Sequence, residues 1–482
     1  MARMIAASDE PDAVVIGGGI AGLACAVALT DAGLRVVVLE RERIAGGRAR
    51  SWRDAASGDV VDIGPHVLLS HYDNMLHLLE RLGTRRQVVW HTHELITLFD
   101  RRPIVMRLHR LPAPLPLVPG LLATPTVSLR DKLSNARVTW LAMRMRTDDV
   151  RRLDAVDART LLRSLGVTER FIEWFWASVA MTIENVPLER CSAGSLLRLY
   201  RHLIGHNAYR FGFPAVGLGE LFAPPAVAAI GAGGGRVLCE TEARRILIEH
   251  GRAAGVALAG GACLPARFCI AAVPPQDLRP LLPDAVAARE PFARLGDFEP
   301  SPYISTYVWF DRKLGSERFW ARVWSPTNLN YDFYDLSNIR PAWAERPSVL
   351  AANIVYSHRA AALDDDEIVR ATVAEAAEFV PWAARAKIRH ARVHRIAMAR
   401  PCPLPGIERL RPSARTPLPG LYLAGDWLDT GLPMSMESAV RAAYVAAEEV
   451  LRDAGRPRKL ARPLPALDGI TAFVSRWGRR VA

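Results

Sequence analysis

The first hydrophobic positions of the chain fall into two short runs, which are separated by a glycine-rich turn and a helical segment. Residues 12–16 contain a β-branched run of the kind that is buried in a parallel sheet. The turn Gly17-Gly-Gly-Ile-Ala-Gly22 follows at once, and residues 23–32 are rich in small and apolar helix formers. A second hydrophobic run covers residues 34–39. The pattern predicts a strand, a tight turn, a helix and a second strand.

Later segments resemble further parts of such a sheet in known proteins. Gly234-Gly-Arg-Val237 and Ile270-Ala-Ala-Val-Pro274-Pro275 combine turn residues with short apolar runs. Residues 421–423 predict a strand that ends in Ala-Gly425-Asp426, and residues 436–451 predict the helix that follows it. Because these pieces lie far apart in the sequence, we expect an α/β fold with a discontinuous Rossmann-like domain and an inserted α+β domain.

The first turn has the spacing G-x-G-x-x-G that binds a dinucleotide. Gly17 makes the tight turn, Gly19 lets the backbone approach a pyrophosphate, and Gly22 lets the helix pack on the strand. The helix N-terminus then offers free N–H groups and a partial positive charge to the phosphates. Glu40, 18 positions beyond Gly22, is placed to accept hydrogen bonds from a ribose hydroxyl. The sequence therefore predicts a dinucleotide site.

Gly46-Gly47-Arg48 follows this acid closely. Two glycines permit close approach of the backbone, and a guanidinium supplies paired donors to phosphate oxygens. Together with Ala-Gly425-Asp426, this element resembles flavoproteins of the amine oxidase and phytoene desaturase superfamily. The resemblance implies FAD, with Arg48 at the diphosphate and Asp426 at the ribityl chain. The FAD contacts that it implies are Gly17, Gly19, Ile20, Ala21, Gly22, Glu40, Arg41, Gly47, Arg48, Gly64, Pro65, His66, Val237, Gly425, Asp426, Met434 and Met436.

Within the superfamily, most of residues 12–452 resembles the hydroxysqualene dehydroxylases, squalene-associated FAD proteins related to carotenoid desaturases. The similarity lies in Asp62-Ile-Gly64-Pro65-His66 with Tyr72, in residues 175–187 and 216–222, and in Gly425-Asp426-Trp427 with Thr430-Gly-Leu-Pro433. Residues 328–335 do not match this branch well. The resemblance implies that a long isoprenoid is the substrate, and that a helical insert over about residues 128–205 covers a tunnel above the flavin.

We expect two domains and a tail. Residues 10–75, 214–290 and 405–455 form the FAD-binding domain, residues 76–213 and 291–404 form the substrate domain with its helical insert, and residues 456–482 form a basic tail. Ser128-Leu-Arg-Asp131 resembles a capping box that opens a helix. The aromatic cluster Phe171, Trp174, Phe175 and Trp176 is either tunnel wall or core, because both use the same residues.

Dehydroxylation of hydroxysqualene requires hydride from flavin N5 and an acid that protonates the leaving oxygen. The candidate acids are His66, Glu184 and Asp429, with Tyr72 as a supporting donor. A group that titrates near neutral pH suits the role and favours His66. The alternative is that His66 only bonds the backbone near the cofactor.

Three other functions stay open. A phytoene or carotene desaturase would run the electrons the other way, into oxidised flavin. An amine oxidase would use a lysine in flavin reoxidation, but Lys313 follows Asp311-Arg312 in an expected turn. A flavin-binding protein without catalysis is the third. No G-x-S-x-G motif competes, and Cys402 between two prolines is a poor covalent flavin link.

Composition narrows the class of protein. Of 482 residues, 50% are hydrophobic and 23% are charged, which excludes disorder as the main state. The 62 basic residues outnumber the 50 acidic ones by 12, and only four are lysine. Two explanations of the many arginines stay open. One is codon usage, and the other is attraction to phosphate or to an acidic membrane. Nucleic acid is disfavoured because no basic run is interleaved with aromatics.

Cysteines and histidines predict neither disulfides nor a metal. Six scattered cysteines without a C-x-x-C pattern suit a reducing cytosol, and the early strand leaves no room for a signal peptide. The pairs His91/His93 and His202/His206 have no nearby Cys or carboxylate partner in a recognisable pattern. We expect no metal site.

Two segments suggest contact with a membrane, from which an isoprenoid would be collected. The uncharged run at residues 111–129 contains five prolines, so it cannot span a bilayer as a helix. After Gly455 the chain has seven basic residues against Asp468 alone. Leu467, Ile470, Val474 and Trp477 fall on one helical face, which either binds anionic lipid or docks on the protein. We expect a cytoplasmic, peripherally membrane-associated protein.

Overall fold

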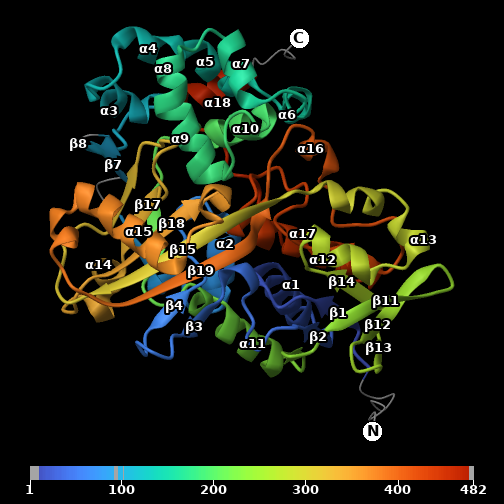
Figure 1. Ribbon diagram of the computed structural model, residues 1–482. Coiled ribbons are helices and arrows are strands. Elements are labelled where there is room, and N and C mark those ends of the chain that lie inside the picture. Colours follow the sequence, from blue (N-terminus) through green and yellow to red (C-terminus); the bar gives the residue numbers. More distant parts are fainter. Residues whose placement is uncertain (1–9, 92–95, 101, 477–482) are drawn as a thin grey trace.

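A five-stranded parallel sheet forms the base of the structure. The computed structural model describes residues 10–91, 96–100 and 102–476. The strands lie in the order β10 (Arg236–Leu238), β2 (Val36–Leu39), β1 (Ala13–Ile16), β14 (Phe268–Ala271) and β20 (Leu421–Leu423) (Figure 1). Segments more than 380 residues apart thus share one sheet, and the predicted discontinuous α/β fold is confirmed.

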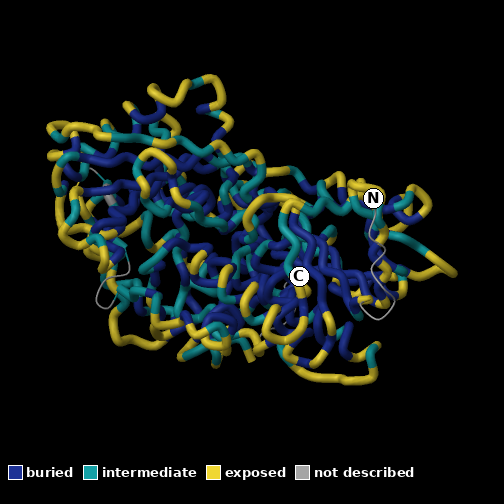
Figure 2. Tube along the Cα trace, turned by 90° about the horizontal axis from the view of Figure 1, so that it is seen from below, coloured by how far each residue is buried: buried dark blue, intermediate teal, exposed yellow. Residues whose placement is uncertain are grey.

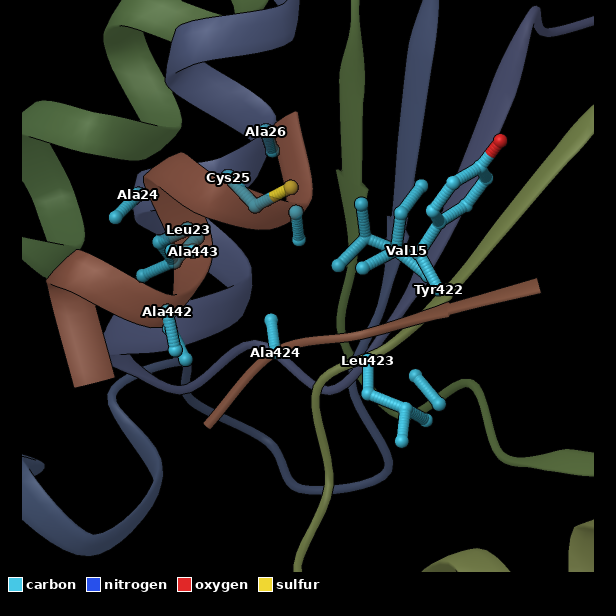
Figure 3. Close-up of a cluster of buried hydrophobic side chains, with 14 of the residues drawn as sticks. Val15, Leu23, Ala24, Cys25, Ala26, Tyr422, Leu423, Ala424, Ala442 and Ala443 are labelled. Carbon is cyan, nitrogen blue, oxygen red and sulfur yellow. The ribbon is translucent and has the colours of Figure 1, made fainter. Parts of the chain in front are cut away.

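Three helices pack together against this sheet and share its hydrophobic core. α1 (Ile20–Asp31) packs against α17 (Met436–Asp453) and α11 (Ala223–Ala232). α1 is apolar around almost its whole circumference, the pattern of a helix that is buried on all sides. Figure 3 shows side chains of α1, among them Leu23 and Cys25, together with Val15, Leu423 and Ala443.

A seven-stranded mixed sheet forms the second body. One of its faces is covered by α15 (Asp365–Phe379), which packs with Val308, Phe333 and Leu350 in an apolar cluster. The strand order is β19 (Ile388–Pro401), β15 (Pro300–Phe310), β18 (Val349–Val355), β17 (Asp332–Asp335), β16 (Phe319–Arg322), β7 (Ile96–Asp100) and β8 (Arg102–Met106).

A helical layer covers the molecule at the top of Figure 1. The predicted capping box is present, because Ser128 Oγ accepts from Asp131 N and the Asp131 carboxylate accepts from Ser128 N. Two π-helical turns, Ile172–Trp176 and Ala180–Glu184, flank α9. The helices are α3 (Val118–Ala123), α4 (Leu129–Ser134), α5 (Ala136–Arg144), α6 (Thr147–Leu153), α7 (Ala158–Ser164), α8 (Glu169–Phe171), α9 (Ala177–Val179) and α10 (Ala193–Ile204).

Small sheets and helices connect these bodies. The antiparallel pieces are β3 (Ser51–Arg53) with β4 (Val60–Asp62), β5 (Leu68–Leu69) with β9 (Phe211–Pro214) and β6 (Val88–Trp90), and β11 (Ala243–Glu249) with β12 (Arg252–Leu258) and β13 (Cys263–Pro265). The remaining helices are α2 (Asp73–Arg81), α12 (Pro275–Leu278), α13 (Asp284–Ala287), α14 (Leu336–Ile339), α16 (Ile407–Leu410) and α18 (Gly469–Arg476). α2 packs on α17, so the domain boundary predicted at residue 75 falls inside a helix that accompanies the parallel sheet.

The tail runs back over the protein surface. Lys459 pairs with Glu448 of α17 at 2.7 Å, and α18 packs on α5 of the helical layer. Leu467 and Val474 pack on the protein while Ile470 is exposed; Trp477 lies outside the described residues. Figure 2 shows buried segments in the interior and exposed ones at the rim. No helix in the described part of the chain is long and apolar enough to span a bilayer.

Candidate active site

A cavity of about 960 Å³ extends from the carboxyl end of the parallel sheet to the helical layer. Its first part is lined by the glycine turns that follow β1 and β2 and by the turn after β20. Its second part is lined by side chains of the seven-stranded sheet and of the helical layer, including Phe319 and Phe175. Ligands of open parallel sheets bind at this end of the strands.

The glycine turns leave the N-terminus of α1 accessible to a phosphate. Gly17 has φ +105°, and a Cβ there would lie 2.8 Å from the carbonyl oxygen of Ala272. A Cβ at Gly47, where φ is +55°, would lie 3.0 Å from the Cα of Gly19. A Cβ at Gly22 would lie 1.9 Å from the carbonyl oxygen of Gly17, so this glycine provides the helix contact and does not line the cavity. The arrangement needs backbone without side chains at all these positions.

Glu40 makes backbone contacts that the sequence pattern does not reveal. Its Oε2 accepts from Gly18 N at 2.8 Å and its Oε1 accepts from Glu42 N at 2.9 Å. The carboxylate therefore holds the first glycine turn to the end of β2, while also lining the cavity. Arg41 lines the cavity and pairs with Asp277 at 3.3 Å.

Arg48 joins the two motifs that are most distant in sequence. Its Nη2 lies 2.7 Å from Asp426 Oδ1, and its Nη1 donates to the carbonyl of Ala399 at 3.0 Å. The ion pair places Gly-Gly-Arg beside Ala-Gly-Asp at the cavity wall. Of the other predicted cofactor contacts, Ile20, Ala21, Gly64, Pro65, Gly425, Met434 and Met436 line the cavity, whereas Val237, in β10, does not.

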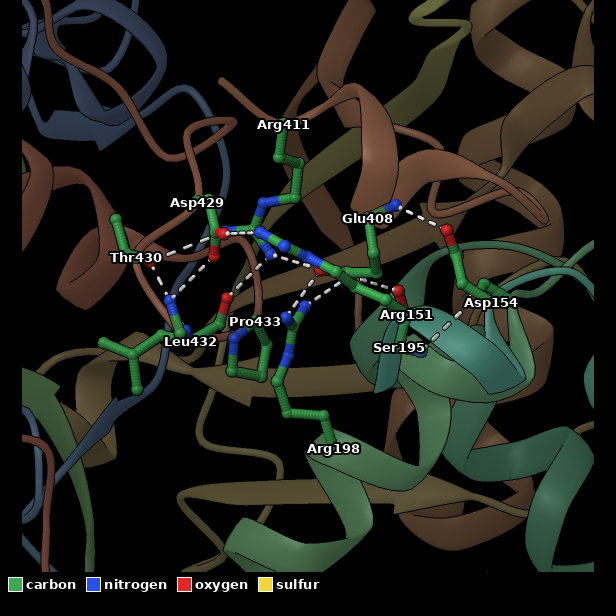
Figure 4. Close-up of polar contacts among 12 residues, drawn as sticks. Arg151, Asp154, Ser195, Arg198, Glu408, Arg411, Asp429, Thr430, Leu432 and Pro433 are labelled. Carbon is green, nitrogen blue, oxygen red and sulfur yellow. Dashed lines mark hydrogen bonds and ion pairs between the residues drawn. The ribbon is translucent and has the colours of Figure 1, made fainter. Parts of the chain in front are cut away.

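A buried arginine organises the loop that follows Asp426. Arg411 donates to the carbonyls of Leu428 and Leu432 at 3.0 Å each, and it pairs with Glu408 at 3.3 Å. Arg198 of the helical layer donates to the same carboxylate at 2.6 Å (Figure 4). Burial raises the pKa of Glu408, but the charges of Arg198 and Arg411 outweigh it and hold the pKa at about 2. The sequence analysis did not identify this network, because no local pattern distinguishes these arginines from the other 56.

His66 lines the cavity in a form that does not suit an acid. Its Nδ1 lies 2.8 Å from the carbonyl oxygen of Gly64. A carbonyl only accepts, so Nδ1 carries the hydrogen and Nε2 of the neutral ring is an acceptor. Burial lowers the pKa of His66, and nearby Arg48 acts in the same direction. At neutral pH the ring can therefore accept a proton at Nε2, and it has no free N–H to donate.

Tyr72 and Glu437 lie together where α17 begins. Burial and the nearby Glu437 raise the pKa of Tyr72 to about 12, so the phenol stays protonated and can donate. Glu437 accepts from the backbone of Asn74 at 3.0 Å and of Met75 at 2.8 Å, which closes the N-terminus of α2. Ser435 caps α17 by accepting from Ser438 N at 3.2 Å. Ser435 and Glu437 line the cavity but carry no motif in the sequence.

The other two predicted acids do not line the cavity. Glu184 is buried and pairs with Arg400 at 2.8 Å, and it is Arg400 that reaches the cavity wall. Asp429 lies at the surface and pairs with Arg151 at 2.8 Å, as Figure 4 shows. Neither carboxylate is positioned to protonate a group inside the cavity.

The aromatic cluster of the helical layer divides between wall and core. Trp174 and Phe175 line the cavity, whereas Phe171 and Trp176 are fully buried in the helical layer. Leu117 and Met106 extend the apolar wall from the proline-rich region. The second part of the cavity is thus mostly hydrocarbon and aromatic surface, as a lipophilic ligand requires.

Histidines in the cavity do not form a metal site. Burial lowers the pKa of His202 to about 3 and that of His206 to about 4, so both are neutral. Within residues 10–91, 96–100 and 102–476, no group of three or more His, Cys, Asp or Glu could hold a metal ion. His93 lies outside the described residues. Lys313 donates to Ser337 and Asn338 at 2.9 Å and does not line the cavity.

The first part of the cavity fits FAD. The turn at Gly17 and Gly19 and the N-terminus of α1 suit its diphosphate, with Arg48 beside them. The turn at Asp426 and the N-terminus of α17 suit its ribityl chain and flavin ring. All these groups face one continuous space, although they come from two distant segments of the chain.

Comparison with known proteins agrees with this geometry. Residues 20–451 match the family described as flavin containing amine oxidoreductase. The 15-cis-phytoene desaturase of Synechococcus elongatus is 26% identical over 474 residues, which cover 94% of this chain and 98% of the relative. The chloroplast and chromoplast enzyme of that name from Solanum lycopersicum is 26% identical over 453 residues, 91% of this chain and 77% of the relative. The solved structure of wild-type putrescine oxidase bound to putrescine superposes with a TM-score of 0.73 at 17% identity, over 92% of this chain and 99% of that one.

Proposed function

The chain belongs to the family of flavin-containing amine oxidoreductases, and from this premise we propose that it acts on a long isoprenoid. It is an FAD-dependent oxidoreductase. The proposal rests on one observation, the continuity of the FAD cradle with a large cavity walled by Trp174, Phe175 and other apolar side chains. Our first candidate reaction is the reductive dehydroxylation of hydroxysqualene to squalene, on the resemblance of Asp62-Ile-Gly64-Pro65-His66 and Gly425-Asp426-Trp427 to that branch.

The residues of the chain orient both reactants in this reaction. FAD, when bound, supplies transfer of a hydride to or from carbon. Arg48 and Asp426 would hold the cofactor, and Arg411 holds the loop that follows Asp426. His66 offers an acceptor at Nε2 and Tyr72 offers a phenol donor at the cavity wall. The apolar walls exclude water from the reacting carbon.

Desaturation of phytoene or a carotene is the second candidate. The relatives named above are phytoene desaturases, and their similarity extends over more than nine tenths of this chain. Both candidates need the same hydrocarbon tunnel and differ in the direction of electron flow. A desaturase also needs an acceptor for a proton, which Nε2 of His66 could provide.

Amine oxidation has less support from the site. An amine oxidase would use a lysine to assist flavin reoxidation. Lys313 does not take this role, because its Nζ donates to Ser337 and Asn338 instead. The likeness to putrescine oxidase, at 17% identity, is one of fold. The large apolar wall is also more extensive than a small diamine needs.

Three incubations of the purified FAD-loaded enzyme separate these reactions. Hydroxysqualene with a chemical reductant should give squalene, identified by product mass. Phytoene with a quinone under anaerobic conditions should give a product two mass units lighter if the enzyme is a desaturase. Hydrogen peroxide from an amine would support the oxidase instead. Turnover of neither isoprenoid would contradict the proposal.

We also propose that the helical layer touches an anionic membrane, from which the lipophilic substrate enters. Leu129 and Leu133 of α4 and Trp140 of α5 are 60%, 62% and 52% exposed. The adjoining helices α3 and α18 add the exposed Leu122 and Ile470. Arg130 and Arg137 lie exposed among them and suit lipid phosphates. An apolar surface of this kind is characteristic of an interaction site.

Sedimentation with phosphatidylglycerol vesicles tests the membrane contact. Replacing both Leu129 and Leu133 with Glu should release most of the enzyme from the vesicles, because carboxylates resist burial among acyl chains. Trp382→Glu is the matched control, since Trp382 is 53% exposed but follows α15 on the other body. Equal release by both variants, or by neither, would contradict contact through α4.

A further inference from the structure

One face of the seven-stranded sheet carries a row of mostly polar residues, of which Asp332 lines the cavity. Residues directly opposite each other in paired antiparallel strands share a face. The register pairs Ala321 with Asp332, Asp332 with Asn353, Asn353 with Ser305, and Ser305 with His394. The row therefore crosses five strands from β16 to β19. It includes part of residues 328–335, the segment that does not match the dehydroxylase branch well.

The opposite face of the same strands is mostly apolar, although it also carries the buried Thr306 and Asp335. Phe333, Leu350 and Val308 point away from the cavity and pack under α15. A sheet covered on both faces would be expected to carry apolar residues on both. Here the covered second face carries Asp332, Asn353 and Ser305, although all three are buried. These polar groups need an explanation that core packing does not supply.

Asp332 is only partly satisfied by the protein. Its Oδ2 accepts from the hydroxyl of Tyr334 at 2.6 Å. Its Oδ1 makes no hydrogen bond of good geometry within the described residues, and neither does the side-chain amide of the neighbouring Asn353, although that amide lies near enough to lower the pKa of Asp332. Asp332 is 7% exposed, so water does not replace the missing partner at the surface. Leaving such a group unpaired costs free energy that a bound ligand can recover.

The position of Asp332 links the two parts of the cavity. Asp332 and Tyr334 line the cavity together with the apolar Phe319 of β16. A Cβ built on Gly64 would lie 3.6 Å from Ser305, the residue two strands away in the same row. The polar row thus runs beside the turn that carries His66. Asp332 and His66 therefore line the same cavity.

We propose that Asp332, held by Tyr334, binds a hydroxyl group of the substrate, so that the enzyme takes an isoprenoid alcohol and not a plain hydrocarbon. The inference rests on the proposed function, namely that the cavity takes a long isoprenoid. A carboxyl group hydrogen-bonds a hydroxyl whether it is protonated or ionised. Burial raises the pKa of Asp332 to about 6, against the opposing effects of Tyr334 and Asn353, so both forms are accessible. A hydrocarbon would leave Oδ1 unpaired in an apolar cavity.

Binding of a matched pair of lipids tests this assignment. Hydroxysqualene and squalene, delivered in detergent micelles, are titrated into the FAD-loaded enzyme while the flavin absorbance spectrum reports binding. We expect wild type to bind hydroxysqualene at least about tenfold more tightly than squalene. Asp332→Leu should lose this preference by weakening hydroxysqualene binding and leaving squalene binding unchanged or tighter. Tyr334→Phe should reduce the preference to a smaller extent.

Asp335→Asn is the matched control, because Asp335 is a second buried acid of β17. Its carboxylate already accepts from Ser337 N at 3.0 Å and from Ser348, so it has a structural role. The preference for hydroxysqualene should survive in this variant. Equal affinity of wild type for the two lipids, or equal loss of both in Asp332→Leu, would overturn the role of Asp332 alone. Failure of wild type to bind either lipid would overturn the proposed function as well. If wild type bound a long-chain amine more tightly than hydroxysqualene, the Asp332 carboxylate would be assigned to an ammonium group and not to a hydroxyl.

Discussion

At the scale of single residues, burial controls the charge of the groups around the cavity. It lowers the pKa of His66, raises that of Tyr72 to about 12, and raises that of Asp332 to about 6. The first two are therefore uncharged at neutral pH, whereas Asp332, with a pKa of about 6, is still mostly ionised there and becomes neutral only at lower pH. Neutral side chains such as His66 and Tyr72 are compatible with a lipophilic substrate, because they impose little cost for placing hydrocarbon beside them.

The ionisation of Asp332 predicts a pH dependence of stability. The carboxyl ionises near 3.8 in the unfolded chain and at about 6 in the folded one, so the folded state holds the proton more tightly. Stability is therefore lost as pH rises from about 4 to 6, by roughly 3 kcal/mol. We expect Asp332→Asn to lack this decrease, measured by urea unfolding of the holoenzyme at intervals of pH. A constant difference between variant and wild type from pH 4 to 7 would contradict the burial of this carboxyl.

Glu184 and Arg400 form a buried pair whose two members depend on each other. Glu184→Ala should lower the free energy of unfolding by roughly 3–5 kcal/mol, because Arg400 would remain buried without its partner. Glu184→Gln should cost less, since the amide still accepts from Arg400. Urea unfolding gives both values. If Glu184→Gln kept its stability but lost turnover entirely, the carboxyl would have a role in proton transfer after all.

At the scale of elements, Glu408 joins the helical layer to the loop at the flavin end of the cradle. It pairs with Arg198 of α10 and with Arg411, and Arg411 donates to the carbonyls of Leu428 and Leu432. A bend of the loop away from Arg411 would move Asp426, which is paired with Arg48. The position of the FAD contact thus depends on a charge from outside the parallel sheet.

Removal of Glu408 should therefore weaken both the fold and the cofactor site. We expect Glu408→Ala to lose roughly 3–5 kcal/mol of unfolding free energy, because two buried arginines lose their counter-charge. FAD should dissociate at least about tenfold more readily, measured by fluorescence on dilution. Arg151→Ala is the control: it breaks the exposed pair with Asp429 on the same loop and should cost no more than about 1 kcal/mol. Equal effects of the two variants would contradict the loop-holding role of Glu408.

At the scale of the whole molecule, the tail stabilises two bodies at once. The carboxylate of Glu448 accepts from Leu460 N and Ala461 N at 2.8 Å each, and Asp468 N donates to the carbonyl of Gly205 at 2.8 Å. α18 then packs on α5. The basic tail, which we considered as either lipid anchor or docked segment, docks on the protein over its described part.

Truncation after Gly455 should therefore destabilise the protein. Glu448 is buried and would lose its three donors, so we expect a loss of at least about 2 kcal/mol and a lower midpoint of thermal unfolding. A chain ending at Arg476 keeps α18 and is the control, with no expected change. If truncation after Gly455 left the midpoint unchanged but released the protein from vesicles, the tail would serve the membrane rather than the fold.

The sequence by itself determined the parts whose contacts are local. The β-branched run before Gly17, the helix after it and the capping box at Ser128 depend on side chains within a few positions of each other, so periodicity and turn chemistry identify them. The cofactor turns were predictable for the same reason. At Gly17 and Gly47 the backbone conformation itself requires glycine.

Only the tertiary structure decided which acids face the cavity. Glu184 turned out to pair with Arg400, which is 216 residues away, and Asp429 lies at the surface. Asp332 faces the cavity because the register of β17 between β16 and β18 sets which side of the strand points inward. A shift of one residue would exchange Asp332 for Phe333, and no local pattern fixes that register. The orientation of a side chain in a sheet is set by its neighbouring strands, and these come from distant parts of the chain.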